Sequence, residues 1–410
     1  MVQVVRGMRD LIGQDALIQE TIESTFVRVF SSYGYLPQYT PAVESYELFK
    51  AKGTVGEAIK DEIYYFKDKS ERELALRFEF TSSLARIVST QQIKMPYKRY
   101  QIGEVYRYDR PQAKRYRAFY QADIDILGVE GLEAELEVMF VIRDCFTALN
   151  LKPRIVFNSR KLLNDLLKKY ALGKEIEAMR ILDKMDKVSE NDIIKMLEEK
   201  EINPEIIQVI KENDIKKISQ IVGQDSVGLK EIIDFQKICK DNNLDFIKFD
   251  STLARGFEYY TGIVFEIKLD NGPSVGGGGR FDNLVSTYGG KDTPAVGIGL
   301  GVSRIFDYLK ETGLKIGLDG IFLIGLDISS LQKNSIAGEL RKSIFVETDL
   351  KGMKISNAIE YAQKKGYSFV GVVGENELKE NKITLKNIKT GQQEMFFLNE
   401  IKEIKLFLAK

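Results

Sequence analysis

The sequence contains no histidine in its 410 residues. Histidine is the usual general base near neutral pH, the commonest metal ligand and the base partner of many serine and cysteine nucleophiles. Cysteine is also scarce, and Cys145 and Cys239 cannot form a structural zinc site by themselves. An enzyme built from this sequence must therefore work by positioning its reactants, by fixed cations or by Mg²⁺ held on carboxylates.

The sequence also lacks net charge and long apolar stretches. Sixty lysines and arginines offset sixty aspartates and glutamates, so a nucleic-acid-binding surface would have to be a local patch. No stretch approaches 18 apolar residues, and residues 1–14 lack the apolar run of a signal peptide. Both cysteines lie in helical patterns, which indicates reduced thiols. We therefore expect a cytoplasmic protein with no membrane segment.

The length predicts two or three domains. Residues 1–158 and 246–314 alternate strand, turn and helix patterns, which predict an α+β domain with an antiparallel sheet. Residues 159–245 carry charged and apolar residues at helical spacing and predict an inserted helical module, for which a solvated bundle and a binding role are equally open. Residues 315–410 alternate strands and helices and predict a compact α/β domain.

The segment Leu253–Glu266, LARGFEYYTGIVFE, places Arg255 close to Tyr259 and Tyr260 at the start of a strand pattern. Because neighbouring strand residues face opposite sides, one phenol should point into a cleft. An arginine beside exposed phenols suits a carboxylate or phosphate ligand. Taken alone, the segment is better explained as an aromatic strand edge that carries a surface arginine.

The segment Gly103–Gln121, GEVYRYDRPQAKRYRAFYQ, predicts a hairpin with a basic turn. Its five cations are Arg107, Arg110, Lys114, Arg115 and Arg117. Guanidinium groups match phosphate oxygens bidentately, and an aromatic residue of the second strand could stack on a base. The alternative is a basic hairpin tip in solvent.

Two further segments are candidates for ligand contacts. In Leu76–Arg86, LRFEFTSSLAR, we expect Glu79 and Thr81 on one face of a strand end, where the carboxylate could receive an α-ammonium group. A solvated edge carboxylate is the alternative.

The second segment is glycine-rich and runs through Val275–Gly290 and Pro294–Ile305. Four consecutive glycines permit close backbone approach to a ligand, although they could equally thin a strand for packing. Arg304 opens a predicted helix and could bind phosphate. The fingerprints of Walker and dinucleotide-binding loops do not fit.

Together these segments resemble the class II aminoacyl-tRNA synthetases, and specifically the histidyl-tRNA synthetase family. Leu253–Glu266 is similar to that family's histidine-recognition segment, Gly103–Gln121 to motif 2 and Gly297–Arg304 to motif 3. Tyr35–Phe49 resembles motif 1, which builds the dimer interface. The C-terminal domain, with TLKNIKTGQQ, is similar to the family's anticodon-binding domain, and QADIDILG resembles the archaeal and eukaryotic branch.

The resemblance implies an ATP-dependent ligase that uses Mg²⁺, forms histidyl-adenylate and transfers histidine to tRNA(His) as a homodimer. This chemistry needs no histidine in the protein, because the substrate carboxylate is already an anion when it attacks the α-phosphate. Guanidinium groups and Mg²⁺ can hold the two anions together and stabilise the charge that develops on phosphorus.

The resemblance also implies roles for individual residues. The histidine-binding residues would be Glu79, Phe80, Thr81, Arg107, Gln121, Asp125, Arg255, Tyr259 and Tyr260. The ATP-binding residues would be Arg107, Asp109, Arg115, Phe119 and Arg304. Asp125 would meet the imidazole ring and Phe119 would stack on adenine. Arg107 and Arg255 would carry catalysis, Gln112 and Lys114 would contact the tRNA acceptor end, and no metal would be held by the protein alone.

Four positions depart from the family pattern. Phe281 stands where tyrosine is common, and Ser303 replaces an acidic residue before Arg304. Lys114 occupies a site often held by glycine, and Ala118 one often held by a larger polar residue. None of these changes removes an arginine that the chemistry needs.

Two alternative functions are open. One is a non-catalytic histidine-binding paralogue, such as the regulatory subunit of ATP phosphoribosyltransferase, which the presence of Arg255 and of the C-terminal domain opposes. The other is an RNA-binding or sensor module with the same fold. The absence of histidine suggests a further hypothesis, that the protein can still be made when charged histidyl-tRNA is scarce, with chance as the alternative.

Overall fold

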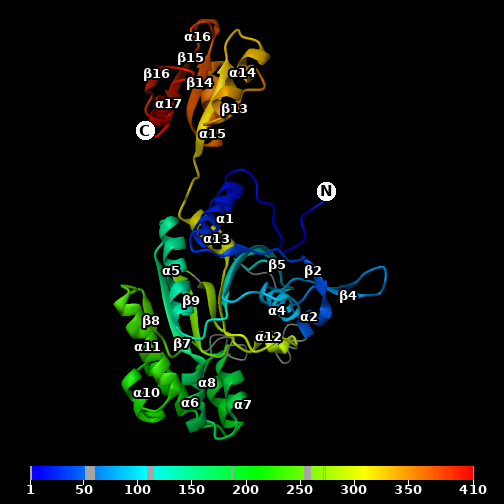
Figure 1. Cartoon of the computed structure of the whole chain (residues 1–410), viewed down its shortest axis with the longest axis vertical. Helices are drawn as coiled ribbons and strands as arrows, with labels where there is room; N and C mark the ends of the chain where they lie inside the picture. Colours follow the sequence, from blue (N-terminus) through cyan, green and yellow to red (C-terminus); the bar gives the residue numbers. More distant parts are fainter. Residues whose placement is uncertain are drawn as a thin grey trace. The chain divides into compact units, whose positions relative to one another are not determined.

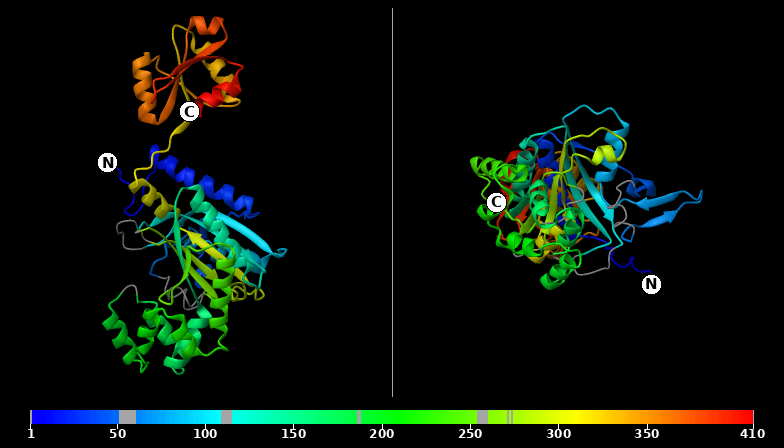
Figure 2. Two further views of the ribbon diagram at one scale, coloured as in Figure 1. Left: turned by 90° about the vertical axis from the view of Figure 1, so that its left-hand side faces the viewer. Right: turned by 90° about the horizontal axis from the view of Figure 1, so that it is seen from below.

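The computed structural model describes residues 2–50, 61–108, 115–185, 188–253, 260–270, 272 and 274–409. These residues fall into two units (Figures 1 and 2). Unit 1 comprises Met1–Asp10 and Gln19–Leu309, and unit 2 comprises Leu11–Ile18 and Lys310–Lys410. Among the described residues, no helix combines the length and the hydropathy that a membrane crossing requires.

An eight-stranded sheet forms the centre of unit 1. In spatial order its strands are β1 (Leu36–Pro37), β5 (Tyr97–Tyr106), β6 (Ala118–Leu127), β11 (Ala295–Leu300), β10 (Ser274–Arg280), β9 (Ile263–Leu269), β7 (Pro153–Ser159) and β8 (Ile247–Phe249). The predicted α+β layout is confirmed. Antiparallel pairing holds across the centre, whereas both edge strands pair in parallel, β1 with β5 and β8 with β7.

Two helices, α1 (Gln14–Ser32) and α5 (Glu133–Ala148), cover one face of this sheet. Phe30 of α1 packs on Tyr100 of β5, with ring centroids 5.6 Å apart. Val138, Met139 and Ile142 of α5 are fully buried. Because strand residues alternate between faces, the neighbours of Tyr100 in β5 point to the opposite face.

Outside residues 159–245, the described part of unit 1 also contains a smaller sheet and four short helices. The sheet has the order β2 (Val43–Ser45), β4 (Glu73–Leu76) and β3 (Tyr65–Lys67). The helices are α2 (Tyr46–Lys50), α4 (Thr81–Thr90), α12 (Leu284–Thr287) and α13 (Val302–Glu311).

The prediction that Glu79 and Thr81 share a strand end is wrong. Strand β4 ends at Leu76, and Thr81 is the first residue of α4. The Glu79 carboxylate accepts hydrogen bonds from the backbone N–H of Thr81 and from that of Ser82. N–H groups in the first turn of a helix have no partner inside the helix, and the carboxylate supplies one. It therefore stabilises a helix that begins at Thr81 in place of a longer strand.

Between β7 and β8, the described residues form six helices. They are α6 (Arg160–Tyr170), α7 (Glu175–Leu182), α8 (Glu190–Glu198), α9 (Glu205–Glu212), α10 (Ile215–Val222) and α11 (Val227–Asp241). Figure 1 shows them in green beside the β7–β8 edge. Helices α11 and α6 touch through their backbones, because a Cβ on Gly228 would stand 2.0 Å from the backbone nitrogen of Leu162.

Unit 2 is built on a five-stranded sheet. Its order is β13 (Phe345–Thr348), β12 (Leu318–Gly325), β14 (Tyr367–Val373), β15 (Lys382–Asn387) and β16 (Gln393–Phe397). The helices are α14 (Ser330–Arg341), α15 (Ile355–Lys365), α16 (Glu375–Lys379) and α17 (Ile401–Leu408). Side chains of α14 and α17 fill one core and those of α15 another, so the sheet is covered on both faces (Figure 2, left).

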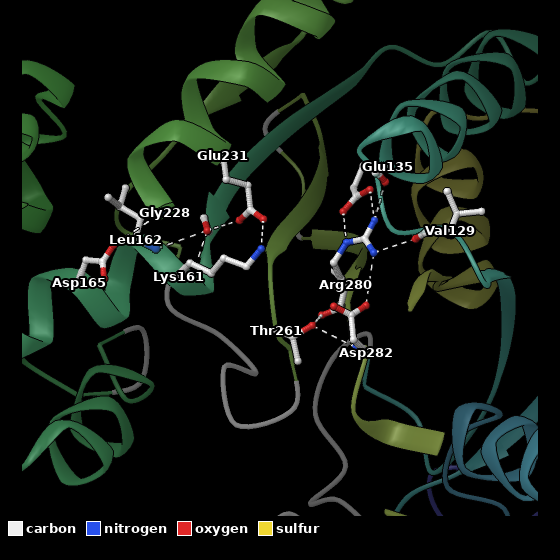
Figure 3. Close-up of polar contacts among 12 residues, drawn as sticks. Val129, Glu135, Lys161, Leu162, Asp165, Gly228, Glu231, Thr261, Arg280 and Asp282 are labelled. Carbon is white, nitrogen blue, oxygen red and sulfur yellow. Dashed lines mark hydrogen bonds and ion pairs between the residues drawn. The ribbon is translucent and has the colours of Figure 1, made fainter. Parts of the chain in front are cut away.

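One buried ion pair ties α5 to the end of β10 (Figure 3). Arg280 donates from Nε to Glu135 Oε1 and from Nη2 to Glu135 Oε2, both at 2.7 Å. Its guanidinium also donates to the carbonyl oxygens of Val129 and Gly131. The glutamate side chain is fully buried and that of Arg280 almost so. The pair therefore fixes the chain just before Phe281.

We predict that Glu135→Gln lowers the free energy of unfolding by about 3–5 kcal/mol, because it leaves a buried guanidinium without its charged partner. Chemical denaturation measures the change. Glu190→Gln is the matched control, because its pair with Lys211 is half exposed, and it should change stability little. Equal losses in the two variants would contradict this role of the buried pair.

Candidate active site

A cavity of about 410 Å³ lies in unit 1, on the sheet face opposite α1 and α5. Strands β6, β9, β10 and β11 all contribute to its walls, together with residues before α4 and after β5. The side chains that carry polar or charged groups into it include those of Thr81, Arg107, Arg115, Gln121, Asp123, Asp125, Tyr260, Glu266, Ser303 and Arg304.

Glycines form the floor of the cavity. Gly297 and Gly299 of β11 stand opposite Gly279 and Gly277 of β10, and residues opposite each other in a sheet share a face. A Cβ on Gly297 would stand 2.0 Å from Asp125 Oδ1, and one on Gly299 would stand 2.7 Å from Gln121 Nε2. Side chains larger than hydrogen on β11 would therefore displace the polar groups of β6.

The β6 wall carries three polar side chains in alternation, Gln121, Asp123 and Asp125. The Gln121 Nε2 donates to Asp123 Oδ1 at 2.6 Å. Beneath them lies Arg99 of β5, opposite Asp125 in the sheet and fully buried. Its Nη2 is 2.6 Å from Asp125 Oδ2, an ion pair without the alignment of a hydrogen bond. Among the described residues, none accepts a hydrogen bond from the Nε or Nη1 of Arg99.

Burial controls the protonation of both carboxyls. It raises the pKa of Asp123 to about 7, where the charge of Arg99 opposes the rise and those of Asp125 and Glu79 add to it. Burial also raises the pKa of Asp125 to about 6, again against Arg99. Such a cluster of buried, mutually coupled acids is typical of a functional site.

Arg107 follows β5 and lies between two aromatic rings. Its guanidinium carbon is 4.4 Å from the centroid of Phe78 and 5.2 Å from that of Phe119. Its Nε donates to the carbonyl oxygen of Phe78 at 3.3 Å. Stacking on aromatic faces holds a guanidinium in place while its edge can still bind oxygen anions.

Two further arginines line the cavity, Arg115 before β6 and Arg304 in the first turn of α13. The Nη1 of Arg304 donates to the carbonyl oxygen of Ser274 at 2.7 Å. Ser303 is buried beside it, and its hydroxyl accepts a hydrogen bond from the backbone N–H of Tyr120 at 3.0 Å. The serine thus ties α13 to β6, a role that its short side chain can fill.

Tyr260 and Leu253 close the cavity beside β9. Tyr260 packs with Phe281 in an apolar cluster, and burial raises the pKa of its phenol. The carbonyl oxygen of Leu253 accepts from Asn158 Nδ2 at 3.1 Å. Two residues earlier, Ser251 donates from its backbone nitrogen and its hydroxyl to Asn213 Oδ1, at 2.8 and 2.9 Å. The inserted helices therefore help to hold this wall.

The structure brings eight of the predicted site residues together along one cavity. They are Thr81, Arg107, Arg115, Phe119, Gln121, Asp125, Tyr260 and Arg304. Glu79 and Phe80 lie just before Thr81, where Glu79 caps α4 and Phe80 is fully buried. Asp109, Gln112, Lys114, Arg255 and Tyr259 lie outside the described residues.

Three charged residues of this region were not predicted, Arg99, Asp123 and Glu266. Asp123 could have been found, because it stands two residues before Asp125 in a strand and so must share its face. Arg99 carries no such signal, because its position beneath Asp125 depends on the register of β5 and β6.

The chain is similar to known proteins over nearly its whole length. A model of the family "Histidyl-tRNA synthetase" matches residues 7–305, and one described as "Anticodon binding domain" matches residues 329–405. A curated histidine--tRNA ligase of Pyrococcus abyssi is 33% identical over 424 residues, covering 96% of each chain. A histidine--tRNA ligase 1 of Bacillus anthracis is 33% identical and covers 95% of this chain and 96% of its own. The chain belongs to the histidyl-tRNA synthetase family.

The fold agrees with this assignment. The crystal structure of histidyl-tRNA synthetase from Nostoc sp. PCC 7120 covers 99% of both chains with a TM-score of 0.82 and 26% identity. Archaeal ligases are among the similar sequences, as the resemblance to that branch led us to expect.

The buried carboxyls make the stability of this synthetase-family chain depend on pH. A carboxyl whose pKa is raised by folding binds its proton more tightly in the folded state, so its contribution to stability falls as the pH rises from about 4 to about 7. We therefore predict that Asp123→Asn raises the free energy of unfolding of the unliganded protein at pH 8, by roughly 1–4 kcal/mol, and leaves it nearly unchanged at pH 4.

Denaturant titrations at the two pH values measure this effect. Asp234→Asn, which changes an exposed carboxyl of α11, is the control and should have no effect at either pH. Equal destabilisation by Asp123→Asn at pH 4 and pH 8 would contradict the raised pKa of the Asp123 carboxyl.

Proposed function

We propose that the chain activates histidine with ATP to form histidyl-adenylate and then transfers histidine to tRNA(His). The observation that carries this proposal is the cavity itself. It combines Arg107, stacked between Phe78 and Phe119, with the buried carboxyls Asp123 and Asp125 on one continuous strand wall. The guanidinium suits an anion, and the two carboxyls suit a polar ring. Histidyl-adenylate presents both, an anionic phosphate and an imidazole ring.

Activation joins a carboxylate oxygen of histidine to the α-phosphorus of ATP, and pyrophosphate leaves. In transfer, a ribose hydroxyl of the tRNA attacks the carbonyl carbon, and AMP leaves. The first step needs no protein base, because the attacking carboxylate is already deprotonated. Arg107 would hold the carboxylate and the α-phosphate close together, which places the reactants in line and offsets the charge that develops on phosphorus.

We assign the remaining residues from the resemblance to the family. Gln121, Asp125, Tyr259 and Tyr260 would bind histidine, and Thr81 with Glu79 and Phe80 would form the wall around its ammonium group. Phe119 would stack on adenine with the ring face that Arg107 does not cover. Arg115 and Arg304 would bind the outer phosphates, with Asp109 near the adenine amino group. Arg255 would meet the α-phosphate from the opposite side, and Gln112 and Lys114 would contact the tRNA acceptor end.

Mg²⁺ would enter with ATP. Among the described residues, no group of three metal-ligating side chains stands ready to hold an ion. Mg²⁺ at nucleotide sites is commonly bound by substrate phosphates with one or two carboxylates, so such a group is not required. The ion would neutralise charge on the outer phosphates, next to Arg115 and Arg304.

The parts of the chain would divide the work. We propose that residues 1–158 and 246–314 form the catalytic domain, with residues 159–245 as a helical module inserted into it. Residues 315–410 would bind the anticodon, which the family match at residues 329–405 supports. Free, buried thiols at Cys145 and Cys239 suit a reducing compartment such as the cytoplasm.

A histidine-dependent ATP–pyrophosphate exchange assay tests the proposal. We predict exchange in the parent protein and a loss of about 10²–10³-fold in Arg107→Gln, the size expected when a charge-stabilising donor is removed. Arg143→Gln, on the exposed side of α5, should retain the parental rate. No exchange in folded parent protein would leave the non-catalytic histidine-binding paralogue, or a sensor module, as the better account.

The proposed homodimer rests on exposed apolar side chains of the motif 1 region and the small sheet. Leu36, Tyr39, Val43, Tyr65 and Phe66 are all exposed in the single chain, Tyr39 by 86%. Large apolar side chains that stay exposed in a single chain are candidates for burial at a protein interface.

We predict a dimer for the parent protein in sedimentation equilibrium and a shift toward monomer for Tyr39→Arg. Ile176→Arg, at an exposed apolar position of α7, should remain dimeric. A parent protein that sediments as a monomer, or a Tyr39→Arg variant as dimeric as the parent, would contradict this interface.

A further inference from the structure

The cavity contains a second carboxyl, Asp123, to which the resemblance gives no role and for which the proposed mechanism names no partner atom on the substrate. It lies on the same strand face as Asp125 and lines the same cavity. The side chain is 4% exposed, close to the 3% of Asp125. Gln121 holds it by donating to Oδ1, the one side-chain hydrogen bond that Asp123 makes with the described residues.

The charges around Asp123 are unevenly matched. Arg99, on the neighbouring strand β5, favours its ionised form, and Asp125 and Glu79 oppose it. Arg99 lies against Asp125, at 2.6 Å, so its charge is already engaged there. Tyr260 faces both aspartates, and Glu266 stands on the opposite wall near Lys268. Two buried carboxyls thus share one buried guanidinium, and a ligand that brings a positive charge would balance the set.

The glycine floor makes room for such a ligand next to both aspartates. The side chains of β6 lie over Gly299 and Gly297 of β11, opposite Asp123 and Asp125. The next strand leaves open space, because a Cβ on Gly277 of β10 would meet nothing closer than the Phe265 carbonyl oxygen, at 3.4 Å. An imidazole ring has two nitrogens, and its protonated form donates from both. Each nitrogen of a ring placed over Gly277 could therefore donate to one carboxylate of β6.

We propose that Asp123 is the second carboxylate partner of the substrate ring, so that histidine is bound with a proton on each ring nitrogen. This inference rests on the proposed function and extends it to the protonation state of the substrate. Asp125 accepts from one nitrogen and Asp123 from the other. Asp123 therefore contributes to specificity, since a neutral amino acid of similar size would leave one or both buried carboxylates without a partner.

Proton uptake on binding tests the proposal directly. At pH 8 a free imidazole side chain is mostly neutral, so binding in the doubly protonated form must take up close to one proton from the solvent. Isothermal titration calorimetry of histidine, without ATP, in buffers of different ionisation enthalpy counts that proton. We expect uptake close to one for the parent protein. For Asp123→Asn we expect uptake near zero and a histidine Kd at least ten-fold higher.

Glu266→Gln is the matched control, because it removes a carboxylate from the opposite wall of the same cavity; it should keep the parental proton uptake. Thermal unfolding of each variant confirms that it is folded. An uptake near zero in the parent protein would overturn the proposal, with Tyr260 then the better partner for the second nitrogen. An equal uptake in the parent and in Asp123→Asn would overturn it as well.

The titration and the pyrophosphate exchange assay together separate this inference from the proposed function. If histidine binds and supports pyrophosphate exchange but proton uptake does not depend on Asp123, only the inference about Asp123 fails. If histidine neither binds nor supports exchange, the proposed function fails too.

Discussion

Neighbouring central strands β10 and β11 carry glycine at the paired positions that face the cavity, and the architecture of the site follows from this. With no side chains on the floor, the walls can stand close on either side, Asp123 and Asp125 from β6 and Val264 and Glu266 from β9. Even a methyl group at Gly297 would meet the Asp125 carboxylate. The same hydrogen-bonded sheet that makes the core thus also leaves space for a ligand.

The site concentrates charge that the fold alone would not favour. Arg99 is fully buried and its side chain makes no aligned hydrogen bond with the residues that the structure describes, and burial raises the pKa values of both aspartates. Buried charges of this kind cost stability unless a partner satisfies them. A bound substrate with complementary groups would supply that partner, so binding and stability are coupled. By contrast, the Arg280–Glu135 pair is fully satisfied within the protein and serves the fold.

The sequence predicted the fold class and most elements, because helical spacing and strand alternation are local signals. It missed α4, since the capping of that helix by Glu79 depends on a turn that the pattern LRFEF hides. It identified Arg107, Phe119, Gln121 and Asp125 through motif resemblance, and all four line the cavity. It could not reveal Arg99, whose neighbour Asp125 is set by strand register. Arg255 and Tyr259 remain predictions from the sequence.

The absence of histidine from the chain is consistent with this site, which works through guanidinium groups, stacked rings and buried carboxyls. We propose that one cavity holds both substrates, the amino acid over the glycine floor and ATP beside Phe119. A crystal structure with histidine and a non-hydrolysable ATP analogue tests this claim most directly. We predict the imidazole ring over Gly277 of the glycine floor, within hydrogen-bond distance of Asp123 and Asp125, with the adenine on Phe119 and the histidine carboxylate at Arg107. Histidine bound elsewhere, or a ring that contacts neither aspartate, would contradict the account.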